Sequence, residues 1–141
     1  MIFVAAATLG DFRYSESRVD FHEGKYISAF LGALRAEAVF PLKYYTRESV
    51  ATMFYVADQL PPSLVLEQID RVLKGDPHSP HLLWYKAMQH LRAGEIESAL
   101  PVIEHLERVG KGWKQTKNAR AVYVAVERHV NVKKAAWEHN L

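Results

Sequence analysis

The sequence contains no cysteine, which excludes a disulfide framework, a thiolate zinc site and a cysteine nucleophile. Long apolar runs are also missing, because the longest, residues 2–9, is far shorter than the roughly 20 apolar residues that a membrane-spanning helix needs. The formal net charge is only +2, which is not the strong positive field of a dedicated nucleic-acid-binding protein. What remains is an ordinary globular composition, with 49% hydrophobic residues in a chain of 141.

Sequence motifs for catalysis and cofactor binding are absent as well. We find no glycine-rich phosphate loop and no nucleophile elbow. His78 and His81 are three residues apart, but no third ligand stands at a spacing typical of zinc sites. We therefore predict a protein that is not an enzyme, with no cofactor and no metal.

Strand-like alternation is not sustained anywhere, and between the glycines and prolines the apolar spacing is helical. Val65, Ile69 and Val72, for example, fall on one face of a helix. The spacing predicts helices over residues 11–22, 25–38, 44–58, 62–74, 80–92, 95–108 and 114–129, with a further short helix over 131–138.

A small pattern of residues recurs along the chain. The three copies are Gly24, Tyr26, Ala29, Ala33, Ala36 and Pro41; then Leu60, Pro62, Val65, Ile69, Val72 and Pro77; then Gly94, Ile96, Ala99, Ile103 and Leu106, with Lys111 in place of the proline. The two steps are 36 and then 34 residues. A period near this length indicates stacked helix-turn-helix units, because one helical pair cannot bury its apolar face alone.

The first copy, Gly24-x-Tyr26-x-x-Ala29-x-x-x-Ala33-x-x-Ala36-x-x-x-x-Pro41, resembles the second half of a tetratricopeptide repeat. The third copy is similar. The second copy lacks the glycine and the aromatic residue, and Arg13 and Ser49 stand where the first helices of such repeats have tryptophan. The resemblance covers about residues 10–113.

This resemblance implies an all-α fold of antiparallel helix pairs stacked as a short right-handed α-solenoid. We expect one tetratricopeptide-like domain over residues 1–141, with repeats at about 10–43, 46–79 and 80–113 and a trailing helix or pair over 114–138. An unrelated helical bundle is the alternative, since any close helix crossing needs small residues.

The same resemblance implies a protein-interaction module that binds a partner peptide or helix in a concave groove lined by the first helix of each pair. Arginine and aromatic residues commonly anchor peptides in such surfaces. For Phe54, Trp84 and Met88 the alternative is a place in the core, and for the arginines a solvated surface. The repeat register places these residues toward the groove: Tyr14, Arg18, Arg47, Phe54, His81, Trp84, Met88 and Arg92.

A second stretch is similar to the soluble helical region after the last membrane helix of bacterial O-antigen ligase/polymerase-like proteins. It comprises residues 23–26, Ala29 and residues 38–42, followed by Arg47. This similarity implies an extracytoplasmic domain of a glycan-transferring membrane protein, with residues 2–9 as the end of a membrane span and the catalytic loops upstream. Otherwise residues 2–9 form an N-terminal helix or strand docked on the first repeat, and a native start at Met1 implies a cytoplasmic protein.

Basic residues gather near the C-terminus. Lys111, Lys114, Lys117 and Arg120 are spaced by three and form a winding ridge on a helix. With aromatic residues interleaved, this basic ridge predicts contact with an anionic glycan or lipid. A solvated face that caps the end of the domain is the alternative. We do not expect a nucleic-acid partner, given the small net charge.

Overall fold

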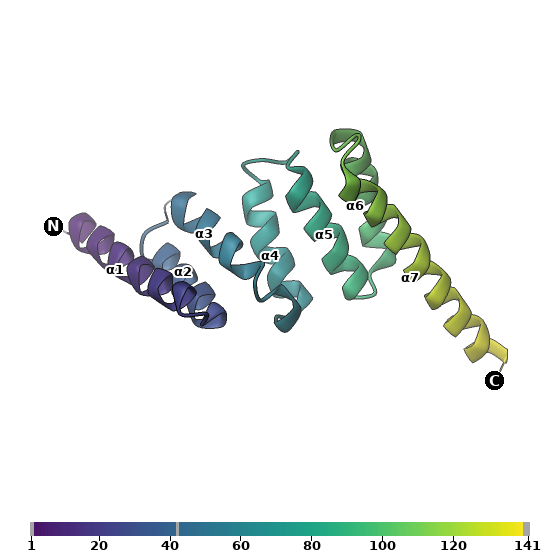
Figure 1. Ribbon diagram of the computed structural model, residues 1–141, viewed down its shortest axis with the longest axis horizontal. Helices are drawn as coiled ribbons and strands as arrows, with labels where there is room; N and C mark the ends of the chain where they lie inside the picture. Colours follow the sequence, from purple (N-terminus) through teal and green to yellow (C-terminus); the bar gives the residue numbers. More distant parts are fainter. Residues whose placement is uncertain (1, 42, 140–141) are drawn as a thin grey trace. The chain divides into compact units, whose positions relative to one another are not determined.

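The computed structural model describes residues 2–41 and 43–139, and within these ranges every regular element is a helix (Figure 1). The chain forms two compact units, Met1–Pro61 and Pro62–Leu141. The all-α class predicted from the sequence is confirmed. The first unit contains α1 (Ile2–His22), α2 (Tyr26–Val39), α3 (Lys43–Met53) and the 3₁₀ helix η1 (Ala57–Gln59); the second contains α4 (Pro62–Leu73), α5 (Pro80–Arg92), α6 (Ile96–Val109) and α7 (Lys114–His139).

In the first unit, α2 packs against both α1 and α3. Its small residues Ala29, Ala33 and Ala36 are fully buried. At the crossing with α1, the Ser17 hydroxyl donates a hydrogen bond of 2.6 Å to the carbonyl oxygen of Ala29. A Cβ added at Gly32 would come within 3.0 Å of the Ser17 Cβ, which is tighter than ordinary packing allows. The small residues of the recurrent pattern therefore serve a close helix crossing.

In the second unit, α5 contacts α4, α6 and α7, and α6 also contacts α7. The recurrent positions Ala99, Ile103 and Leu106 of α6 are completely buried. They correspond in the pattern to the three buried alanines of α2. The residues of α4 at the first two of these positions, Val65 and Ile69, are also completely buried. The residue pattern that recurs in the sequence thus marks positions that are buried in α2, α4 and α6.

The turns between α1 and α2 and between α5 and α6 are built alike. Gly24 and Gly94 both have φ of +77°, a backbone conformation that favours glycine. The next residue in each case, Lys25 or Glu95, donates its backbone N–H to a carbonyl oxygen five residues earlier. This bonding ends the preceding helix in the manner of a Schellman motif. The second copy of the pattern has Leu60 at this place, and there the chain follows a 3₁₀ turn instead.

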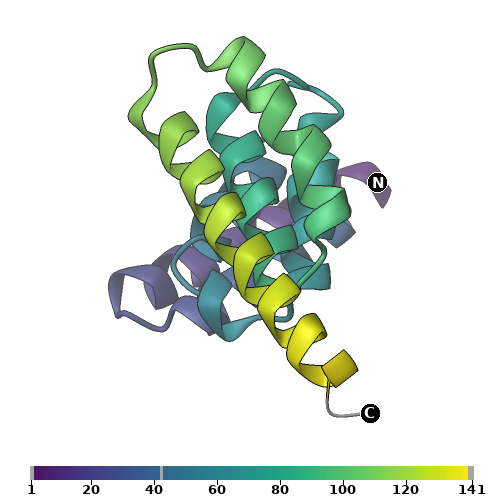
Figure 2. The same ribbon diagram turned by 90° about the vertical axis from the view of Figure 1, so that its right-hand side faces the viewer.

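The helix boundaries correct the sequence prediction at three places. The first helix begins at Ile2 rather than residue 11, so that residues 2–9 continue α1 and are not a separate docked segment. The third ends at Met53 rather than 58, and the expected helix over 131–138 is the continuation of α7. Figures 1 and 2 show α7, with 26 residues, running on past the end of the 14-residue α6.

The early end of α3 is seen in the backbone hydrogen bonds. The N–H groups of Tyr55 and Val56 donate to carbonyl oxygens three residues earlier, so the chain turns more tightly than an α-helix. After η1, Leu60 is extended with ψ of 151°, as expected for a residue before proline. The boundary between the units lies at Pro61–Pro62, inside the stretch 46–79 expected to form one repeat. Among the described residues, no helix is both long and apolar enough to cross a membrane.

Candidate functional site

The first unit has a surface hollow of about 250 Å³ between α1 and α3, which we call the α1–α3 hollow. Ligand pockets for drug-sized molecules start at roughly 300 Å³, so this volume is suited to a single side chain of a larger ligand. Its lining comes from one side of α1 and from the end of α3 with the turn after it. The lining residues are Tyr14, Ser17, Arg18, Phe21, His22, Ala51, Thr52 and Tyr55.

Three aromatic rings form a cluster at the hollow, and two of them, Phe21 and Tyr55, line it. Phe21 of α1 packs edge-on against Tyr26 of α2 at 5.3 Å and against Tyr55 at 4.9 Å, measured between ring centroids. Tyr26 and Tyr55 stack on each other at 5.2 Å. All three distances fall in the favourable range for aromatic pairs. Tyr55 is nevertheless 59% exposed, so the cluster presents apolar surface to solvent in a fixed arrangement.

Two hydroxyl groups in the lining donate hydrogen bonds to the backbone. Ser17 bonds to Ala29 as described, and Thr52 bonds to Ser49. The Tyr14 ring lies 5.3 Å from that of Tyr45. The Tyr45 hydroxyl in turn donates a hydrogen bond to Asp11. The walls are therefore held in place by bonds that do not involve a ligand.

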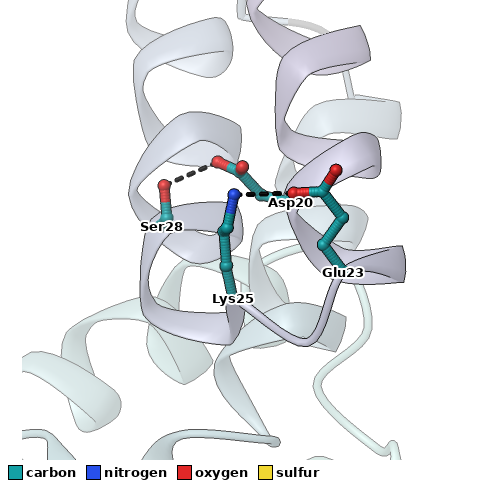
Figure 3. A network of polar contacts seen from close by, with 4 residues as sticks. All are labelled: Asp20, Glu23, Lys25 and Ser28. Atoms are coloured by element: carbon teal, nitrogen blue, oxygen red, sulfur yellow. Dashed lines mark hydrogen bonds and ion pairs between the residues drawn. The ribbon is translucent and has the colours of Figure 1, made fainter.

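Two polar contacts hold the α1–α2 turn beside the aromatic cluster (Figure 3). The Ser28 hydroxyl donates to Asp20 at 2.6 Å, which joins α2 to α1. Lys25 and Glu23 form an ion pair of 2.6 Å within the turn, and the hydrogen bond to Glu23 raises the pKa of Lys25. Because this ion pair is exposed, we assign it a positioning role rather than a large share of stability.

The structure places only part of the predicted groove in this hollow. Tyr14 and Arg18 line it. Arg47 is exposed and Phe54 half-buried, and neither is among the lining residues. The placement of Arg47 and Phe54 on a partner surface stays a prediction.

The other four predicted groove residues follow one face of α5 in the second unit. His81 is exposed and packs against Trp113, with 4.6 Å between ring centroids. Trp84 is half-buried, lies edge-on to Tyr85 at 4.8 Å, and has a buried indole nitrogen. Met88 is half-buried and Arg92 is exposed. A partner-binding role for this face also stays a prediction.

The sequence reasoning missed most of the hollow. Phe21 lies one further turn along the same face as Tyr14 and Arg18, so extending the register would have found it. Ala51 likewise follows Arg47 by one helical turn. Tyr55 could not be placed in this way, because it lies beyond the end of α3 and reaches the hollow through a turn. The remaining missed residues are Ser17, His22 and Thr52.

One residue of the basic ridge, Arg120, takes part in the packing of α7 against α6. Arg120 donates two hydrogen bonds to the carboxylate of Glu107, at 2.8 and 2.6 Å, and thereby joins α7 to α6. This contact lowers the pKa of Glu107 and raises that of Arg120. The Arg120 guanidinium also lies 5.8 Å from the centre of the Tyr123 ring. Lys111, Lys114 and Lys117 are exposed, and the last two line a shallow depression on α7.

The histidines are not arranged as the sequence spacing suggested. His78 faces His105 of α6, with 3.0 Å between its Nδ1 and the other ring's Nε2. Burial, together with the nearby His78 and Arg108, lowers the pKa of His105. Within the described residues, no group of three or more His, Asp or Glu side chains is placed to hold a metal ion.

Neither a protein-family model nor a curated protein matches the sequence. The solved structures that share this fold include two helical proteins that match most of this chain. One is PcrH from Pseudomonas aeruginosa, with a TM-score of 0.58 and 14% identity over 85% of this chain and 92% of that one. The other is the type III secretion chaperone SycD from Yersinia enterocolitica in complex with a peptide of the translocator YopD, with a TM-score of 0.57 and 14% identity over 88% of this chain and 93% of that one.

These likenesses confirm the predicted tetratricopeptide-like, all-α fold. They give no support to the similarity with O-antigen ligase/polymerase-like proteins. At 14% identity, these likenesses show that the fold is shared and do not show that the function is shared.

Proposed function

We propose that this chain is a non-catalytic, chaperone-like module that binds a segment of a partner polypeptide. The observation that carries the proposal is the α1–α3 hollow, an opening of single-side-chain size with a fixed aromatic edge. The SycD structure supports it, because a helical protein of the same fold is found there in complex with a peptide of the translocator YopD. A protein or peptide partner also agrees with the aromatic and arginine residues on the first helices of the predicted repeats.

In this mechanism an apolar side chain of the partner enters the hollow and packs against Phe21, Tyr55 and Tyr14. Burial of one leucine-sized side chain contributes about 1.5–3 kcal/mol. Since the aromatic rings already contact one another, little side-chain freedom is lost on binding, and this preorganisation favours affinity. The remaining affinity comes from contacts of the peptide backbone and flanking residues along the surface.

We propose two further contact surfaces for a longer partner. One comprises Arg47 on α3 and Phe54 directly after the end of α3. The other comprises His81, Trp84, Met88 and Arg92 on α5. Because Arg47 and Arg92 are exposed, their replacement by alanine should change the free energy of unfolding by no more than about 0.5 kcal/mol. A loss of partner binding in these variants would therefore report a contact and not a folding defect.

The experiment starts with a display library of short random peptides selected on the purified chain. The enriched peptides are then measured by fluorescence anisotropy against the wild type and Ala51→Phe. Ala51 is exposed and lines the hollow, so phenylalanine there should fill the opening at little cost to folding. The matched control is Ala38→Phe, at an exposed position of α2 outside the lining.

The proposal predicts that Ala51→Phe abolishes or strongly weakens binding, whereas Ala38→Phe binds as the wild type does. Equal peptide binding by both variants would show that the α1–α3 hollow is not the binding site. Thermal unfolding of each variant separates a blocked site from a destabilised fold.

A further inference from the structure

The pair His78 and His105 belongs to the second unit, whereas the α1–α3 hollow belongs to the first. His78 is exposed in the turn between α4 and α5, and His105 is half-buried in the middle of α6. Two ring nitrogens, Nδ1 of the first and Nε2 of the second, are 3.0 Å apart. The ring planes are nearly perpendicular, at 79°. Residues 27 positions apart in sequence thus bring two metal-binding atoms to one point on the surface.

We propose that this pair is a two-histidine site for a divalent transition-metal ion of the zinc, nickel and copper class. Imidazole nitrogens bind zinc at about 2.0–2.1 Å, which puts two ligands of a tetrahedral ion about 3.3 Å apart. The observed separation is close to this value, so a small rotation of the rings admits an ion in place of a direct contact. Imidazole is a preferred ligand for this class of metals.

Two protein ligands leave further coordination positions open. Because His78 is exposed, water fills these positions, or a side chain of a bound partner does. The ion would link the α4–α5 turn to α6. Arg108 lies one turn beyond His105 on α6, and its positive charge acts on that ring. Its repulsion of a cation lowers the affinity of the site.

The test uses the full chain, titrated by calorimetry first with Zn²⁺ and then with Cu²⁺. The wild type should bind one ion saturably, with Cu²⁺ tighter than Zn²⁺ as the general order of divalent metals requires. Binding should also raise the unfolding temperature, because the site exists only in the folded state. His78→Gln and His105→Gln should each abolish this binding. His129→Gln, an exposed position on α7, is the matched control and should leave it unchanged.

A third variant keeps the test decisive if a histidine variant folds poorly. Arg108→Gln retains both histidines and removes the repulsion, so it should bind Zn²⁺ more tightly than the wild type. Saturable binding that survives in the double variant His78→Gln/His105→Gln would overturn the proposal. So would a wild type that binds neither ion, which would show that the two rings share an ordinary hydrogen bond only.

Discussion

At the scale of single residues, alanine decides how closely the helices approach. Ala29, Ala33 and Ala36 of α2 and Ala99 of α6 have no exposed surface. Their positions recur in the sequence because the same crossing recurs in the fold. A larger side chain at such a place has no free volume to occupy, since helix backbones and side chains already fill it.

We predict that Ala29→Leu lowers the free energy of unfolding by about 1–3 kcal/mol, because the extra methylene groups are forced into the crossing with α1. Ala99→Leu should behave in the same way in the second unit. Ala38→Leu on the exposed side of α2 is the control and should change stability by less than about 0.5 kcal/mol. Urea unfolding midpoints measure all three. Midpoints equal to that of the wild type for both buried variants would show that these alanines are not at close crossings.

At the scale of the elements, the α6–α7 pair depends on a forked contact between Arg120 and Glu107. Both side chains are 37% exposed, so solvent screens the pair and its contribution is small. Its geometry still fixes the register of α7 against α6, because the planar guanidinium meets the carboxylate in two parallel bonds. Arg120, which we predicted from the sequence to contact an anionic ligand, thus forms an ion pair within the fold.

This contact predicts a pH dependence of stability. The hydrogen bond from Arg120 lowers the folded-state pKa of Glu107 below its ordinary value of 4.5. The stabilisation is therefore present above pH 4.5 and is lost as the pH falls from there through the lowered pKa. Thermal unfolding of Glu107→Gln between neutral and acidic pH should show less acid destabilisation than the wild type. Glu67→Gln, at an exposed position of α4, is the control and should follow the wild type. An identical acid dependence for Glu107→Gln and the wild type would contradict the role of this pair.

A helix boundary could be predicted from the sequence where the residues that determine it are adjacent in the chain. The starts of α5 and α6 were predicted to within one residue, because Ser79-Pro80 and Gly94 are adjacent signals in the chain. The end of α3 was missed, since the tight turns that follow Met53 carry no glycine or proline to mark them in the sequence. The aromatic cluster of Phe21, Tyr26 and Tyr55 was missed for another reason. It joins three segments, and no single-helix pattern records their contact.

At the scale of the whole chain, the buried positions of the recurrent pattern pack the helices of both units. In the first unit, residues of α1 and α3 that include Tyr14, Arg18 and Ala51 line the α1–α3 hollow. We propose that this hollow, and not the basic ridge, is where a partner peptide is anchored.

The most direct measurement is a map of the bound peptide by ¹⁵N–¹H NMR, with a peptide enriched on the wild-type chain. We predict that the largest chemical-shift changes fall on the lining of the hollow, at Phe21, Ala51 and Tyr55, and that Ala51→Phe removes them. Changes concentrated on Lys111, Lys114 and Lys117, with the hollow unaffected, would contradict the account.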